Sequence, residues 1–393
     1  MDTIFANRIT DVPRSFLREI LKAATEPGTI SFAGGLPSRE LFPIEAIRNA
    51  TNKVLDTAGA DALQYANSEG FEGLREWIAR RYHKKQGLTI NPNHILITSG
   101  SQQGLDLIGK TLLNDGDDVI IEEPGYLGAI QAFSLYQANF HPVPLHTNGI
   151  DITQFAKALN THDPKIFYAV PNFQNPSGLT YDETNRQQIA DLIRDTRTFL
   201  IEDDPYGDLR FMGEPKPSFK TLIPDNTIQL GTFSKTVVPS LRIGWIVAPE
   251  YIYEKLLIAK QASDLHTNAL GQRIDHQFLL DNDLDAHIKK ICQTYSIRRD
   301  AMISAIHDHF PNDIQCTEPE GGMFVWVTLP EDISSMTLFE KAIQQSVAFV
   351  PGHPFYINAK STNTLRLNFS CMDVETIEIG VKRLANALNK QHA

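Results

Sequence analysis

The sequence contains little cysteine and no long apolar run. Among 393 residues there are three cysteines, Cys292, Cys316 and Cys371, and they form no CxxC pair. An odd number of widely spaced thiols argues against a disulfide framework and favours a reducing compartment. No apolar segment reaches the roughly 20 residues that a membrane-spanning helix needs. The sequence therefore predicts neither a disulfide-rich secreted domain nor a membrane protein.

Basic clusters and an export leader are lacking as well. The chain has 36 Lys and Arg against 47 Asp and Glu, which gives a net charge of -11. A phosphate-rich polymer is therefore an unfavourable partner, and we expect no nucleic-acid binding. The N-terminus shows no basic segment followed by an apolar core, so we expect a cytoplasmic protein. The histidines are scattered, and their spacing predicts no metal site.

The chain is longer than a single hydrophobic core usually supports, so we expect two domains with a cleft between them. From residue 95 to residue 248, short apolar strands alternate with helical segments. This alternation predicts an α/β fold with a mainly parallel, helix-covered sheet. The expected strands are 95–98, 119–122, 166–170, 198–201, 227–233 and 243–248.

The C-terminal part predicts a smaller α+β domain. A long helical tract, 287–309, precedes a strand region at 320–328, and a last helix covers 374–388. We divide the chain into an N-terminal arm and helix that joins the small domain, a large domain, and a small C-terminal domain. Their residues are 1–45, 46–290 and 291–393.

One lysine stands out. Lys235 follows the apolar run 227–233 and precedes a Ser/Pro turn, with Arg242 a short reach downstream. A lysine can form a Schiff base with a carbonyl only when burial or nearby positive charge lowers its pKa. The buried strand and Arg242 would supply both, and Arg242 with the Ser234 hydroxyl could hold a phosphate. This combination suggests pyridoxal 5'-phosphate (PLP), whereas the alternative is an ordinary solvated lysine after a strand.

Further candidate ligands follow other strands. The turn Ser99–Gly104 opens a helix, and its free amides favour an anion. Asp203 follows a buried strand, where open α/β sheets bind ligands, although helix capping is an alternative that suits Asp204 better. Arg366 alternates with apolar neighbours on a strand, so it lies either on a solvent face or toward a carboxylate in the cleft.

Together these segments resemble the fold-type I PLP-dependent aminotransferases of class I and II. The matching motifs keep the family's order and rough spacing over nearly the whole chain. They are Ser99–Gly104, Asn175–Gly178, Asp203–Tyr206, Ser234–Lys235 and Leu365–Leu367. Four more segments resemble the broad-specificity branch that holds the 2-aminoadipate and kynurenine aminotransferases. These are Ser31–Pro37, Leu63–Tyr65, Phe173–Pro176 and Glu320–Trp326.

The resemblance implies a role for each matching position. Lys235 would be the Schiff-base lysine that moves a proton between the substrate Cα and the cofactor. Asp203 would keep the pyridine nitrogen protonated. Asn175 and Tyr206 would donate to the ring's phenolate oxygen, while Tyr126 would stack on the ring. The phosphate would be held by Gly100, Ser101, Gln102, Ser234 and Arg242, assisted by Tyr65 of the partner subunit in a homodimer.

The substrate contacts are implied in the same way. Arg366 would clamp the α-carboxylate, helped by Asn175 and the backbone at Gly35. Arg18 falls in a Ser-x-x-Arg pattern that meets a distal substrate carboxylate in the aminoadipate-type members. No metal is implied.

The implied function is transfer of an amino group from an amino acid to a 2-oxo acid, with 2-oxoglutarate as the expected acceptor. The donor could be 2-aminoadipate, an aromatic or a branched-chain amino acid. A PLP-dependent lyase or decarboxylase is an alternative, because the same cofactor supports both. A non-catalytic PLP-binding regulator is another, against which the intact Lys235 and Arg366 argue. The family-like region begins almost at Met1, so a fused DNA-binding role is disfavoured.

Overall fold

The computed structural model describes residues 4–10, 20, 26–358 and 362–389. Its largest element is an eight-stranded sheet in the order β2-β9-β8-β7-β6-β3-β4-β5. The five strands from β8 to β4 are mutually parallel, whereas β9 is antiparallel to both of its neighbours. The mainly parallel sheet that the sequence predicts is therefore confirmed. The strands are β2 Ile95–Thr98, β3 Asp118–Glu123, β4 Asn139–His146, β5 Gly149–Ile150, β6 Ile166–Ala169, β7 Phe199–Asp203, β8 Thr227–Thr232 and β9 Gly244–Val247.

Helices cover both faces of this sheet. Because side chains alternate along a strand, Ile166 and Tyr168 pack with α5, α6 and α10, while Phe167 and Ala169 pack with α7, α8 and α9. These helices are α5 Ser101–Leu112, α6 Leu127–Ser134, α7 Ile152–His162, α8 Glu183–Ile193, α9 Phe219–Leu222 and α10 Glu250–Asp264. At the β2 and β9 end, a third apolar cluster joins the sheet to two further helices, α4 Glu72–Gln86 and α11 Ala269–Asp281.

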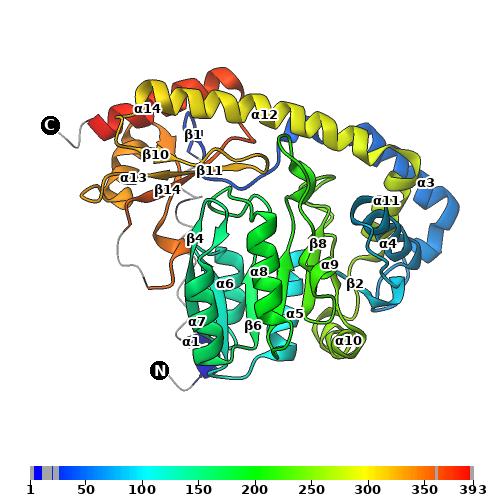
Figure 1. Cartoon of the computed structure of the whole chain (residues 1–393). Helices are drawn as coiled ribbons and strands as arrows, with labels where there is room; N and C mark the ends of the chain where they lie inside the picture. The colour runs from blue at the N-terminus through cyan, green and yellow to red at the C-terminus, as the bar shows by residue number, and fades with distance from the viewer. Residues whose placement is uncertain (1–3, 11–19, 21–25, 359–361, 390–393) are drawn as a thin grey trace.

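A smaller antiparallel sheet lies beyond the carboxyl ends of the parallel strands. Its order is β10-β11-β14-β13, and β1 pairs separately with β12. The strands are β1 Ile30–Ser31, β10 Gln315–Cys316, β11 Phe324–Thr328, β12 Val347–Ala348, β13 Val350–Pro351 and β14 Thr364–Asn368. Figure 1 shows α12, Leu284–His309, running across the top of the molecule from this sheet toward α11. The remaining helices are α1 Asn7–Thr10, α3 Ile44–Ala62, α13 Ser335–Gln344 and α14 Val374–Asn389, with 3-10 turns at Arg39–Leu41, Pro92–His94, Gly207–Leu209 and His353–Phe355.

Some of these elements do not follow from the sequence patterns. The strand β4 contains Pro142 and Pro144, which lack a backbone N–H and obscure a strand pattern. They are tolerated because β4 pairs along its length with β3 alone and meets only the two-residue β5 on its other side. The helix α3 continues to Ala62, past the helical spacing that the sequence shows from Ile44 to Thr57, with a break in its backbone geometry at Gly59. The amphipathic pattern of residues 11–24 predicts a short helix, and most of these residues lie outside the described part of the chain.

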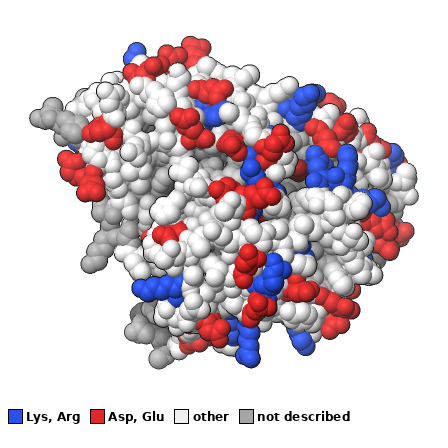
Figure 2. All heavy atoms as spheres, viewed as in Figure 1, with Lys and Arg blue, Asp and Glu red and all other residues white. Residues whose placement is uncertain are grey.

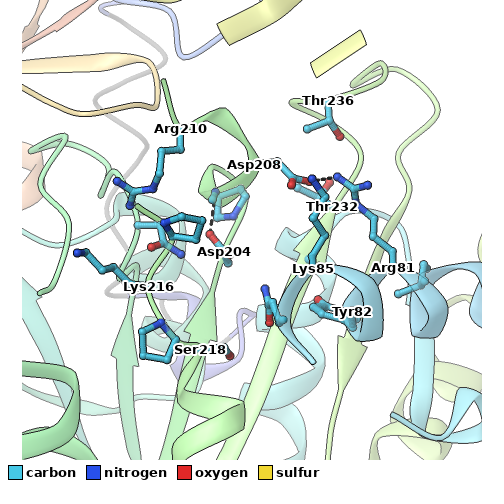
Figure 3. A pocket seen from close by; sticks show the side chains of 18 of the residues that line it. Arg81, Tyr82, Lys85, Asp204, Asp208, Arg210, Lys216, Ser218, Thr232 and Thr236 are labelled. Atoms are coloured by element: carbon cyan, nitrogen blue, oxygen red, sulfur yellow. Dashed lines mark hydrogen bonds and ion pairs between the residues drawn. The ribbon is translucent and has the colours of Figure 1, made fainter. Parts of the chain in front are cut away.

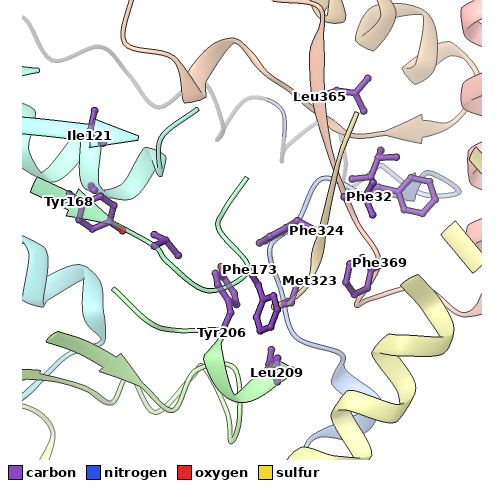
Figure 4. Close-up of a cluster of buried hydrophobic side chains, with 14 of the residues drawn as sticks. Phe32, Ile121, Tyr168, Phe173, Tyr206, Leu209, Met323, Phe324, Leu365 and Phe369 are labelled. Carbon is purple, nitrogen blue, oxygen red and sulfur yellow. The ribbon is translucent and has the colours of Figure 1, made fainter. Parts of the chain in front are cut away.

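The two sheets share one apolar core. Figure 4 shows Tyr168 of the large sheet, Tyr206 from the loop after β7 and Phe324 of the small sheet as parts of the same buried cluster. The rings of Tyr206 and Phe324 meet edge to face, with their centroids 5.8 Å apart. The loops that follow the parallel strands are therefore enclosed between the two sheets, which creates a dry environment for side chains there.

The surface carries charges of both signs. Figure 2 shows acidic and basic side chains interspersed over the visible face, in keeping with a chain whose net charge is -11. Within the part of the chain that the structure describes, no helix is both long and apolar enough to cross a membrane.

Candidate active site

Lys235 lies in the turn after β8, and its Nζ donates a hydrogen bond of 2.9 Å to the carbonyl oxygen of Gly35. Burial, followed by the positive charges of Arg366 and Arg242, lowers the pKa of Lys235 to about 8. The sequence predicted a desolvated lysine beside a cation. The structure agrees, but it adds Arg366 from the small sheet as the stronger cationic influence.

The backbone at Gly100 passes very close to the guanidinium of Arg242. Gly100 has a φ of 80°, and a Cβ placed on it would lie 2.5 Å from Nη2 of Arg242. The same guanidinium nitrogen donates to the carbonyl oxygen of Ser99 at 3.3 Å. Only glycine fits at position 100 for both reasons. Ser101 begins α5 directly after Gly100, so the first free amides of that helix and the Arg242 guanidinium belong to one cationic corner.

The other residues predicted for the phosphate lie around this corner. The hydroxyl of Thr232 donates to Oγ of Ser234 at 2.9 Å, and both side chains are buried. The Gln102 amide donates to the carbonyl oxygen of Gly128 at 2.9 Å, which fixes its orientation. These contacts hold short polar groups in place without using up all of their hydrogen-bonding capacity.

Asp203 ends β7 and is 2% exposed. Its Oδ2 accepts a hydrogen bond of 2.8 Å from the hydroxyl of Tyr168, whereas its Oδ1 has no partner among the described residues. Burial raises the pKa of Asp203 to about 7. A buried carboxylate oxygen without a donor is costly, so this atom is suited to a ligand that brings a proton.

Asp204 and Tyr168 are the two residues next to Asp203, in the sequence and in space. Asp204 accepts a hydrogen bond from the backbone N–H of Gly207 at 2.9 Å, which orders the loop after β7. It is not a helix cap, because the residue before the 3-10 turn is Tyr206. Tyr168 is a site residue that sequence reasoning missed. A signal was nevertheless present, because a tyrosine in the middle of a fully buried strand needs a partner for its hydroxyl.

Arg366 is 3% exposed, so the solvent-facing alternative is wrong. Its Nη1 donates to Oδ1 of Asn175 at 2.7 Å, and its Nη2 donates to the carbonyl oxygen of Ala33 at 2.7 Å. The guanidinium lies over the Phe324 ring, 4.4 Å from the centroid. Burial lowers the pKa of Arg366 to about 10, which still leaves it charged at neutral pH. It forms no ion pair with any residue that the structure describes.

Two tyrosines complete this region. The Asn175 amide donates a long hydrogen bond of 3.5 Å to the hydroxyl of Tyr206, which is buried. Tyr126 immediately precedes α6, and its ring is stacked on that of Tyr168 with centroids 6.4 Å apart. The charges of Asp203, Arg366 and Arg242 all influence the pKa of Tyr126, which burial raises to about 12. These groups therefore share one site.

Tyr65 and Arg18 differ from the rest. Tyr65 is 80% exposed and contacts His266 edge to face at a centroid distance of 5.9 Å. Within the single chain it makes no hydrogen bond to the other predicted residues that are described. Arg18 lies outside the described residues.

One cluster was not anticipated from the sequence. Asp118, His141 and His162 place potential metal-ligand atoms within 4.8 Å of one another, and His141 already hydrogen-bonds Asp118 at 2.7 Å. Asp118 begins β3, whereas the groups around Lys235 follow the carboxyl ends of the strands. The cluster therefore lies at the opposite edge of the sheet and takes no part in the site around Lys235.

Comparisons with known proteins agree with this geometry. The family described as aminotransferase class I and II matches residues 30–384. An aromatic-amino-acid aminotransferase of Thermococcus litoralis is 41% identical, over 98% of this chain and 94% of its own length. A 2-aminoadipate transaminase of Thermus thermophilus is 39% identical, over 96% of this chain and 94% of its own. The crystal structure of a Pyrococcus horikoshii kynurenine aminotransferase superposes with a TM-score of 0.94 at 40% identity, covering 99% of this chain and 98% of that one.

Lys235 and the half-satisfied Asp203 lie at the carboxyl ends of parallel strands, and the buried Arg366 faces them from the small antiparallel sheet. This arrangement on a helix-covered sheet is that of a PLP-dependent enzyme of fold type I. The chain belongs to the class I and II aminotransferases. It is a PLP-dependent transaminase that acts on amino acids, in the branch that includes the aromatic, 2-aminoadipate and kynurenine aminotransferases.

Proposed function

We propose that the chain transfers amino groups to 2-oxoglutarate from 2-aminoadipate, aromatic or branched-chain amino acids. The observation that carries this proposal is the buried Arg366, which has no carboxylate partner among the described residues. An isolated buried cation is unfavourable, and an amino acid and a 2-oxo acid each bring the planar carboxylate that a guanidinium binds best. The relatives that act on aromatic amino acids, 2-aminoadipate and kynurenine support the choice of donors.

The residues fit the cofactor. When bound, PLP supplies an aldehyde that links to an amine and a ring that accepts electrons. We assign Lys235 to the amine and to proton transfer at the substrate Cα, since its lowered pKa leaves a substantial neutral fraction near pH 8. We assign the unpartnered Oδ1 of Asp203 to the pyridine nitrogen, where it would hold a proton. Tyr126 would lie against the ring, and Asn175 and Tyr206 would donate to its phenolate oxygen.

The remaining assignments concern the phosphate and the substrate. Gly100, Ser101, Gln102, Ser234 and Arg242 would hold the phosphate, which suits the corner formed by the start of α5 and the guanidinium. The hydrogen bond from Nζ of Lys235 to the carbonyl oxygen of Gly35 places that backbone segment beside the reactive amine. Gly35 and Asn175 would help Arg366 to orient the substrate carboxylate, and Arg18 would contact a distal carboxylate.

We also propose that the protein is a cytoplasmic homodimer with shared active sites, active in amino acid biosynthesis. The high exposure of Tyr65 supports a contact outside its own chain, with the phosphate site of the other subunit. We divide the chain at residues 45 and 290, because separate sheets form the large and small parts while α12 joins them.

A panel of amino acids tested with 2-oxoglutarate examines this proposal. We expect glutamate to form without release of ammonia or carbon dioxide, and the Lys235→Ala variant to lose turnover and the yellow absorbance of the lysine-linked cofactor. In Arg18→Ala, only dicarboxylic donors should suffer. Release of ammonia or carbon dioxide as the main product would refute amino transfer, and an unchanged spectrum in Lys235→Ala would refute the assignment of the lysine.

A further inference from the structure

A second cavity lies on the opposite face of the large sheet from the groups that we assign to the cofactor. It has a volume of about 650 Å³ and is bounded by α4, the loop 204–218 and the ends of β8 and β9. Neither Lys235 nor Asp203 lines it, whereas the adjacent Thr236 and Asp204 do. Consecutive residues of an extended chain point to opposite faces of a sheet. The Asp203 side chain therefore lies on the side of the cofactor groups, and the Asp204 side chain lies on the side of this cavity. The volume is within the usual range for small-molecule sites, about 300–1,000 Å³.

One wall of this cavity is aromatic. Trp77 of α4, Phe233 and Trp245 all line it. The Phe233 ring contacts Trp245 with centroids 4.8 Å apart and Trp77 at 5.9 Å. The indole nitrogen of Trp245 donates to the hydroxyl of Tyr82 at 2.9 Å, which fixes the indole. Phe233 and Trp245 are 2% and 8% exposed and support Trp77 from behind, so the half-buried Trp77 ring is the aromatic surface that a flat ligand would meet.

Charged side chains line the rest, with four cations and two carboxylates. Figure 3 shows Arg81 and Lys85 beside Asp208 on one side, and Arg210 together with Lys216 on the other. Three of the four cations have acidic partners. Arg81 pairs with Asp208 and Asp285, Lys85 with Asp285, and Arg210 with Glu320.

Lys216 is the exception. It is half-buried and forms no ion pair within the described part of the chain. Its neighbour Arg210 is fixed by Glu320 at 2.6 Å and lies over the Phe173 ring. The Asp204 carboxylate is oriented toward the Gly207 amide. An ammonium without an acidic partner beside a second cation favours an anionic group on the ligand.

We propose that this cavity binds a compact aromatic carboxylate, with its ring against Trp77 in front of the buried Phe233 and Trp245, and its carboxylate at Lys216. The turn that carries Lys235 forms part of the wall through Thr232 and Thr236. A bound carboxylate would therefore contact the reverse side of the catalytic turn without entering the catalytic site. The proposal is independent of the donor specificity given above.

Tryptophan fluorescence offers a direct test. The chain has three tryptophans, and two of them line the cavity. In PLP-loaded Trp326→Phe protein, the remaining fluorescence comes from Trp77 and Trp245. The probe is 4-nitrobenzoate, whose nitro group quenches indole emission, and the neutral 4-nitrobenzamide is the control ligand. We expect saturable quenching by the carboxylate and much weaker quenching by the amide.

Variants in this background locate the binding. Lys216→Met should weaken 4-nitrobenzoate binding about tenfold, as expected for loss of one charge-assisted contact. Lys255→Met, an exposed lysine on α10, should leave it unchanged. Arg366→Met should also leave it unchanged, which separates this cavity from the substrate carboxylate site. No saturable quenching at millimolar probe, equal quenching by the amide, or an unchanged affinity in Lys216→Met would each overturn the proposal.

Discussion

Two buried carboxylates, Glu122 on β3 and Asp203 on β7, show how differently the same burial can be used. Both are at most 2% exposed, and burial raises the pKa of each to about 7. Glu122 receives three hydrogen bonds, from the Val170 amide, the Gln174 amide and the Tyr181 hydroxyl. Asp203 receives one, from Tyr168, and has an oxygen without a partner among the described residues. A raised pKa alone does not mark a functional acid; in Asp203 the raised pKa coincides with an unpartnered oxygen beside the other residues of the site.

The sharpest test of this contrast is Asp203→Asn, compared with Glu122→Gln. An amide at position 203 cannot hold a proton at the ring nitrogen through a negative charge, so we expect kcat/KM to fall about 10²–10³-fold. Glu122→Gln should retain kcat/KM within a few fold. Steady-state kinetics at saturating PLP measures both. Equal losses of kcat/KM in the two variants would contradict the distinction between a functional Asp203 and a structural Glu122.

The reverse contrast should appear in stability. Glu122→Ala leaves the Val170 amide and the Tyr181 hydroxyl without an acceptor and removes one of the two acceptors of the Gln174 amide, so we expect the free energy of unfolding of the apoenzyme to fall by about 2–4 kcal/mol. Asp203→Ala removes the acceptor of one hydroxyl and also an unfavourable buried charge, so its loss should be smaller. Urea unfolding of both apo variants measures this difference, and a larger loss for Asp203→Ala would contradict the comparison.

Tyr168→Phe should have an intermediate effect on activity. Without this donor, the carboxylate of Asp203 loses the contact that orients it, and its pKa should rise further because the hydrogen bond from Tyr168 lowers it. We expect kcat/KM to fall about tenfold, in line with one buried hydrogen bond to a charged group. The pH profile should shift as well, which a merely structural defect would not produce. Tyr181→Phe, which removes a donor to Glu122, is the matched control and should leave the profile unchanged.

The smallest effect concerns the pH dependence of stability. The pKa of Glu122 is raised from its ordinary value of 4.5 to about 7, so the folded state binds the proton more tightly than the unfolded state. The contribution of Glu122 to stability is therefore largest below pH 4.5 and declines as the pH rises toward 7. In Glu122→Gln the decline should be smaller by the contribution of Glu122, while the contribution of Asp203, whose pKa is also raised to about 7, remains. Urea unfolding of both apoproteins at several pH values tests this, and parallel curves would indicate that Glu122 does not titrate in this window.

Lys235 and Asp203 can be predicted from the sequence because each follows a recognisable apolar strand at the edge where parallel sheets bind ligands, and Arg242 because it lies a short reach downstream of Lys235. It left Arg366 undecided, since strand alternation tells which residues share a face but not which face another sheet covers. Tyr168 was missed because its partner lies on a different strand. The role of Tyr65 stays a prediction, since it concerns a second subunit.

The reversed direction of β9 has a mechanical consequence. Two antiparallel strands need no crossover helix between them. The short connection 233–243 therefore joins the end of β8 to the start of β9 at the same edge of the sheet. Lys235 and Arg242 therefore lie in the same connection. The distance between them does not depend on the position of the small sheet relative to the large one. Inserting a residue between them would change the distance from amine to guanidinium while leaving both chemical groups intact.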